Sequence, residues 1–112
     1  MARGMAELSE THPAELKARL ERGEKVFILD VRELAEIALA AFPGAAHIAM
    51  NDIPARIGEL DPERETIVVC HHGMRSAQVG MYLARNGFTH VVNLAGGINA
   101  WSIEADPRVP RY

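Results

Sequence analysis

Three short runs of mainly apolar, β-branched residues constrain the fold of this chain more than any other feature. They are Val-Phe-Ile-Leu at 26–29, Thr-Ile-Val-Val at 66–69 and Val-Val-Asn-Leu at 91–94. Runs that do not alternate between apolar and polar positions are typical of strands covered on both faces. Such strands are parallel and need crossover connections. The pattern predicts an α/β fold: a single three-layer domain whose mostly parallel central sheet of about five strands has helices on both faces.

Helical patterns fill the segments between these runs. Pro13 begins one helix, with Thr11 as its N-cap, Leu16 and Leu20 on its inner face and Gly23 at its end. By the same criteria, the sequence predicts further helices over 32–39, 53–60 and 76–86, a last short one ending near 101, and a short strand over 46–49.

The size and composition fit one core. The chain has 112 residues, of which 48% are hydrophobic, and that is within the usual range of a single domain. We therefore expect one domain over residues 1–112, with its core at about 8–104. The tail 105–112 contains Pro107 and Pro110 and is predicted to be irregular.

Charge and hydropathy limit the partners. Twelve basic and 15 acidic residues give a formal net charge of -3, which argues against a nucleic-acid partner. The start of the chain lacks the apolar block of a signal peptide, and no window approaches the roughly 18 apolar residues of a membrane helix. We expect a cytoplasmic protein with no membrane partner.

The only cysteine, Cys70, directly follows the run at 66–69 and precedes the segment His71-His72-Gly73-Met74-Arg75-Ser76. This position is the turn between a predicted strand and a predicted helix. In open parallel sheets, ligands bind beyond the carboxyl ends of the strands. Asp30 and the segment 94–96 follow two other strands, so three segments are expected to meet at one edge of the sheet.

The segment after Cys70 has the features that a reactive thiol needs. Only the thiolate is a good nucleophile, so the site must stabilise negative charge. Successive backbone N–H groups, the positive end of the following helix and the Arg75 cation are three sources of that stabilisation. Gly73 permits the tight backbone turn that such a ring of N–H groups requires. A metal site is not indicated, because three adjacent residues, Cys70, His71 and His72, rarely wrap one ion.

These residues resemble the rhodanese-like sulfurtransferases, specifically their small single-domain members. The resemblance covers residues 30 to 101 and rests on the order and spacing of several motifs: Asp30-Val31-Arg32-Glu33, Pro43-Gly44-Ala45, His47-Ile48, Cys70 to Ser76, Gly87-Phe88, and Leu94-Ala95-Gly96-Gly97 through Trp101. One departure precedes Pro43, where the family commonly has Gly-His-Ile and this chain has Ala40-Ala41-Phe42. We expect that departure to affect local packing more than activity.

The resemblance implies a persulfide cycle with no cofactor. Cys70 takes the outer sulfur of thiosulfate or a related anionic donor, and a thiophilic acceptor such as cyanide or a thiol then removes it. The loop amides and Arg75 bind the anionic donor, and His71, His72, Met74 and Ser76 complete the loop. Asp30 is expected to brace this loop, and Arg32 to hold a structural ion pair.

Two other functions remain open. Cysteine-dependent phosphatases and arsenate reductases also combine a cysteine with an arginine at a helix start. In this chain four residues separate Cys70 from Arg75, whereas the tyrosine-phosphatase pattern has five. The other alternative is a non-catalytic module, or a persulfide carrier that serves a protein acceptor.

Overall fold

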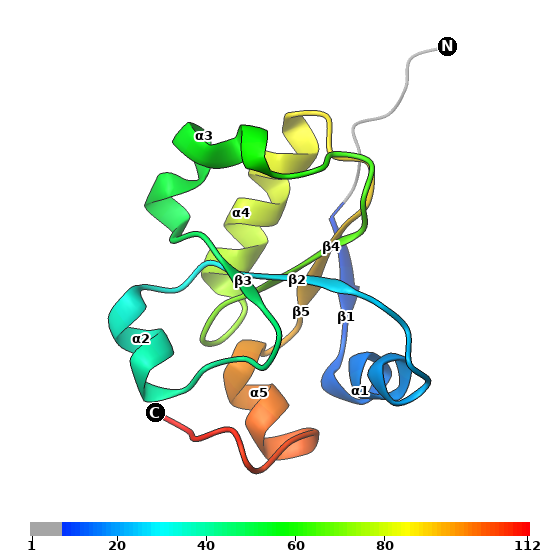
Figure 1. The fold of residues 1–112 in the computed structure, drawn as a ribbon, viewed down its shortest axis with the longest axis vertical. Coiled ribbons are helices and arrows are strands. Elements are labelled where there is room, and N and C mark those ends of the chain that lie inside the picture. The colour runs from blue at the N-terminus through cyan, green and yellow to red at the C-terminus, as the bar shows by residue number, and fades with distance from the viewer. Residues whose placement is uncertain (1–7) are drawn as a thin grey trace.

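Five parallel strands form the one sheet of the computed structural model, which describes residues 8–112 (Figure 1). In spatial order they are β1 (Ser9–Thr11), β5 (Val91–Leu94), β4 (Thr66–Val69), β2 (Phe27–Asp30) and β3 (Ala46–His47). Every neighbouring pair is parallel, and Ile67 at the centre aligns with Ile28 on one side and Val92 on the other. The predicted parallel α/β sheet is confirmed.

Helices cover both faces of this sheet (Figure 1). Helices α1 (Pro13–Glu21) and α5 (Gly97–Glu104) lie on one face, and α4 (Met74–Arg85) and the short α3 (Ile53–Arg56) lie on the other. Two 3-10 turns, η1 (Met50–Asp52) and η2 (Ile57–Glu59), flank α3. Helix α2 (Leu34–Leu39) lies beside the C-terminus of the chain. None of the helices in the described part of the chain is long and apolar enough to cross a membrane.

The strands divide their side chains between two hydrophobic clusters. In β4, Ile67 and Val69 pack toward α1 and α5, whereas Val68 and the following Cys70 pack toward α3 and α4. This alternation follows from the pleat, which sends successive side chains to opposite faces. Cys70 therefore belongs to the face that α4 covers.

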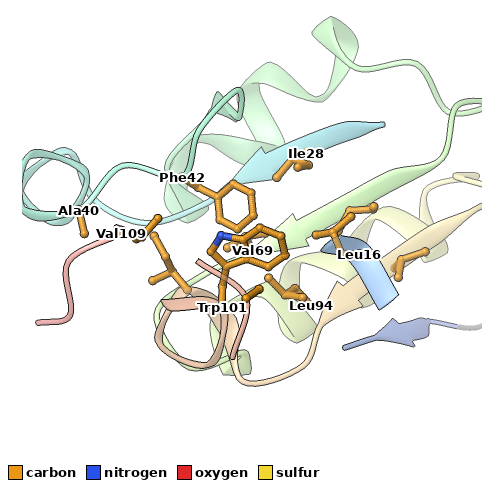
Figure 2. Packing of buried hydrophobic residues seen from close by; sticks show 12 residues of the cluster. Leu16, Ile28, Ala40, Phe42, Val69, Leu94, Trp101 and Val109 are labelled. Carbon is orange, nitrogen blue, oxygen red and sulfur yellow. The ribbon is translucent and has the colours of Figure 1, made fainter. Parts of the chain in front are cut away.

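The departure Ala40-Ala41-Phe42 is accommodated in the cluster under α5. Ala40 and Phe42 are both buried, and the Phe42 ring lies 4.9 Å from the ring of Trp101 (Figure 2). The segment is therefore part of the core, where the two aromatic rings pack together.

One strand, one helix cap and one helix start differ from the sequence prediction. Thr11 is the last residue of β1, an edge strand without an apolar run, and His12 is the N-cap of α1 instead. Helix α4 begins at Met74 because Gly73, with φ of +100°, turns the chain two residues earlier than expected. The loop after Cys70 is correspondingly short.

The tail 105–112 forms no helix or strand, and it packs against the domain. Val109 is buried, and its carbonyl accepts a hydrogen bond from the Ser102 hydroxyl of α5. Tyr112 reaches the loop that follows Cys70.

Candidate active site at the end of β4

The turn between β5 and α5 holds the backbone of the loop after Cys70. The N–H groups of Ile98 and Asn99, in the first turn of α5, donate to the carbonyls of Cys70 and His71 at 2.8 and 3.0 Å. The approach is so close that a Cβ atom at Gly97 would lie 2.5 Å from each of these two carbonyl oxygens. A glycine is required at Gly97 because any side chain would push the loop away.

The sulfur of Cys70 accepts two hydrogen bonds within residues 8–112. The Gly73 N–H donates at 3.0 Å, and the Ser76 hydroxyl, on the first turn of α4, donates at 3.2 Å. The sequence predicts a ring of successive amides here, and that expectation is wrong. Since α4 starts at Met74, the shortened loop supplies one amide and a hydroxyl instead. Both donors stabilise negative charge on the sulfur.

Cys70 and Ser76 are almost completely enclosed. Cys70 is 1% exposed and Ser76 is 0% exposed. In such surroundings a hydrogen bond to a charged sulfur is stronger than it is in water. The sulfur is therefore removed from solvent together with the hydroxyl that donates to it.

Arg75 faces a carboxylate that the sequence analysis did not anticipate. Its two terminal nitrogens donate to the two oxygens of Glu36, on α2, at 2.6 and 2.8 Å. These hydrogen bonds, aided by those from Glu33 and Tyr112, outweigh partial burial and lower the pKa of Glu36 to about 2. The same pair raises the pKa of Arg75. Both groups are therefore charged at neutral pH, and the Arg75 side chain is still 35% exposed.

Asp30 and Arg32 lie beside the site and do not contact the sulfur. The Asp30 carboxylate accepts hydrogen bonds from the backbone N–H and the guanidinium of Arg32, the shortest at 2.6 Å. Arg32 is completely buried, and it also donates to the Ala40 carbonyl and the Tyr112 hydroxyl. Within residues 8–112, Asp30 makes its side-chain hydrogen bonds with Arg32 and none with the loop after Cys70, contrary to the brace that the sequence suggests.

His71, His72 and Tyr112 form a stack of rings on the outer side of the loop. The ring of His71 lies 3.8 Å from that of Tyr112 and 3.9 Å from that of His72. Burial lowers the pKa of His71, and the neighbouring His72 adds to the shift, so His71 is neutral at pH 7. Met74, the first residue of α4, is 75% exposed. No sequence signal connects Tyr112 to this loop, because the tail has no periodicity.

Asn93 is a further residue of the site that the sequence reasoning missed. It is the third residue of β5, and its side-chain amide contacts both Ser76 and Gly73. A polar residue within an otherwise apolar strand was the available signal.

The cavity between α1 and the tail lies apart from this site. It has a volume of about 530 Å³ and is lined by Leu20, Phe42 and Trp101, among others. Phe42 and Trp101 belong to the cluster on the α5 face, whereas Cys70 packs on the α4 face. The cavity and Cys70 therefore lie on opposite faces of the sheet.

Comparisons with known proteins agree with the geometry. A family model described as a rhodanese-like domain matches residues 12–104. A sulfurtransferase of Allochromatium vinosum is 37% identical over 102 residues, which are 91% of this chain and 95% of that protein. The thiosulfate sulfurtransferase GlpE of Pseudomonas fluorescens is 32% identical, over 87% of each chain.

Solved structures give the same assignment. The crystal structure of a rhodanese-like domain protein from Staphylococcus aureus matches with a TM-score of 0.81 at 33% identity, over 94% of this chain and 99% of that one. Together with the relatives named sulfurtransferases, it confirms the resemblance drawn from the motifs and supports sulfur transfer as the general activity. The chain belongs to the rhodanese-like domain family.

Proposed function

We propose that the protein transfers a sulfane sulfur from thiosulfate or a related donor, through a persulfide on Cys70, to cyanide or a thiol acceptor. The observation that carries this proposal is the enclosed sulfur of Cys70 with two donors, the Gly73 N–H and the Ser76 hydroxyl, at 3.0 and 3.2 Å. The thiolate is the nucleophilic form of a cysteine, and both donors are placed to hydrogen-bond to it.

The reaction has two balanced steps. In the first, the thiolate of Cys70 attacks the outer sulfur of thiosulfate, the S–S bond of the donor breaks, and sulfite leaves with the bonding electron pair. The product is a persulfide anion whose charge lies on the outer sulfur. In the second step, the acceptor attacks that outer sulfur, the new S–S bond breaks, and the electron pair returns to Cys70 as thiolate. With cyanide as acceptor, the product is thiocyanate.

Arg75 is the group that we assign to the anionic donor. A guanidinium has five N–H donors, and the two-fold pairing with Glu36 uses two of them. The exposed part of Arg75 therefore keeps donors for a sulfonate while Glu36 remains bound. We assign the entrance of the site to His71, His72 and Met74.

Mass spectrometry of the intact protein after incubation with thiosulfate tests the function. We expect the mass of one added sulfur atom, lost again on addition of cyanide with release of thiocyanate, and neither event in Cys70→Ser. Ping-pong kinetics should accompany turnover. Unmodified protein together with rapid hydrolysis of a small aryl phosphate would make the phosphatase alternative correct. A persulfide that forms but is not passed to cyanide or small thiols would indicate a carrier for a protein acceptor.

A further inference from the structure

The side chain of Asn93 bridges the two residues that donate to the sulfur of Cys70. Its Nδ2 donates to the carbonyl of Gly73 at 3.1 Å, and its Oδ1 accepts from the Ser76 hydroxyl at 2.5 Å. Asn93 is 5% exposed, so both polar atoms are removed from water and need these partners. The orientation of the amide follows from chemistry, since only Nδ2 can donate to a carbonyl.

The Ser76 hydroxyl has one proton and two acceptors. Its oxygen lies 2.5 Å from Oδ1 of Asn93 and 3.2 Å from the sulfur of Cys70. Oδ1 carries no hydrogen, so it competes with a thiolate for that proton. When the sulfur is a thiol, its S–H can donate to the Ser76 oxygen, and the hydroxyl then donates to Asn93.

Each step of the proposed reaction changes how strongly the sulfur of Cys70 competes with Asn93 for the Ser76 proton. In the free thiolate, the negative charge lies on the sulfur of Cys70, which is then a strong acceptor. In the persulfide, the charge lies on the outer sulfur, and the inner sulfur is a weak acceptor. Without another partner, the buried Ser76 hydroxyl would lose its hydrogen bond whenever a persulfide forms.

We propose that Asn93 is a positioning residue that takes the Ser76 proton when the charge moves to the outer sulfur and releases it when the thiolate returns. Asn93 thereby stabilises the persulfide relative to the thiolate. This inference rests on the proposed function for the persulfide, but its effect on the free thiolate holds without any sulfur donor.

The test compares Asn93→Leu with the unchanged protein in two measurements. The first is the rate of alkylation of Cys70 by iodoacetamide against pH. The midpoint is the pH at which alkylation reaches half of its maximal rate. Without Oδ1, the Ser76 proton is available to the thiolate, so this midpoint should move to lower pH. We expect a shift of about half a unit to one unit, which corresponds to the free energy of one hydrogen bond. The second is the rate of sulfur loading from thiosulfate, which should fall at least several-fold.

A second test removes the Ser76 hydroxyl, whose proton Asn93 is proposed to bind. In a Ser76→Ala background, Asn93→Leu should no longer lower the midpoint, because there is no proton to release. The charged and titratable groups next to the loop are Arg75, Glu36, His71, His72 and Tyr112, and they are the same in all these variants. Thr66→Val is the matched control, since Thr66 is a buried polar residue at the opposite end of β4, and it should leave the midpoint in place.

Several results would overturn the proposal. They are an unchanged or higher midpoint in Asn93→Leu, and an equal shift in the Ser76→Ala background. If Asn93→Leu does not fold, Asn93→Asp replaces it: the carboxylate is a stronger acceptor that retains the proton, so the midpoint should rise, and an unchanged midpoint would refute the inference. A shifted midpoint without any sulfur transfer would refute the proposed function alone.

Discussion

At the residue scale, the cation that follows Cys70 in the loop motif is paired with a carboxylate that lies outside this motif. Arg75 is the cation assigned to an anionic donor, yet it is paired with Glu36 through two hydrogen bonds. The carboxylate holds the guanidinium in place, and its negative charge opposes the binding of another anion. On the proposed function, Arg75 and Glu36 would therefore act on donor binding in opposite directions.

Replacement of Glu36 by glutamine should separate these effects. Glu36→Gln keeps a hydrogen-bond acceptor for Arg75 and removes one negative charge, so we expect the KM for thiosulfate to fall roughly 2- to 5-fold, as for a partly exposed charge pair. Steady-state kinetics at low and high ionic strength measure this, and the difference should shrink at high salt. Glu59→Gln, which removes a carboxylate from the exposed pair with Arg56, is the control. An unchanged or higher KM would contradict the assignment.

The residue scale also shows what a sequence can and cannot indicate. Cys70, Gly73 and Ser76 lie within one short segment of the sequence, residues 70–76, so their proximity could be predicted from their spacing. Glu36 lies 39 residues from Arg75, and Asn93 lies 17 residues from Ser76. Their contacts depend on the packing of α2 and β5 against the loop, and no local pattern encodes that packing.

At the scale of elements, α5 determines the shape of the loop that begins at Cys70. Its first N–H groups are used on the carbonyls of Cys70 and His71, and Gly97 has φ of +61°. The sequence analysis placed a turn at Gly96-Gly97 without the reason for it. The reason is the close approach of two backbones, which becomes visible only when β4 and β5 lie side by side.

Gly97→Ala should therefore damage both stability and activity. The added Cβ would meet two carbonyl oxygens at 2.5 Å, and the positive φ adds strain of about 1–3 kcal/mol. Gly87→Ala is the matched control, because Gly87 has φ of +90° but nothing within 4 Å of its Cβ position. We expect similar backbone strain in both variants, with a larger loss of unfolding free energy and at least a 10-fold loss of sulfur transfer in Gly97→Ala only. Chemical denaturation and turnover measure these, and equal behaviour of the two variants would be inconsistent with the steric argument.

At the scale of the whole molecule, a polar network ties α2, α4 and the tail together. The Tyr112 hydroxyl donates to Glu36 at 2.9 Å and accepts from Arg32, while Glu36 binds Arg75 of α4. Strands β2 to β5 and the helices that cover the sheet could be predicted from apolar runs and helical periodicity, whereas β1 could not, because it has no apolar run. This network could not, because its members share neither spacing nor hydropathy.

Because of this network, the free energy of unfolding should depend on pH in the acid range. The pKa of Glu36 is lowered to about 2 from an ordinary value of 4.5, so its contribution is fully present above about pH 4.5 and is lost as the pH falls toward 2. We expect part of the decline in stability between pH 5 and 2 to disappear in Glu36→Gln. Urea denaturation at a series of pH values provides the comparison, with Glu59→Gln again as control. Parallel curves for Glu36→Gln and the unchanged protein would refute this contribution.

The bonds from α5 to the loop have a consequence for the order in which the protein matures. During synthesis Cys70 emerges well before Ile98 and Asn99, the residues whose amides shape its surroundings. A growing chain therefore lacks the hydrogen bonds that hold the loop after Cys70 until its last helix docks on the sheet. On the proposed function, competence for sulfur transfer is acquired at the end of folding, because an incomplete chain has Cys70 without the shaped loop around it.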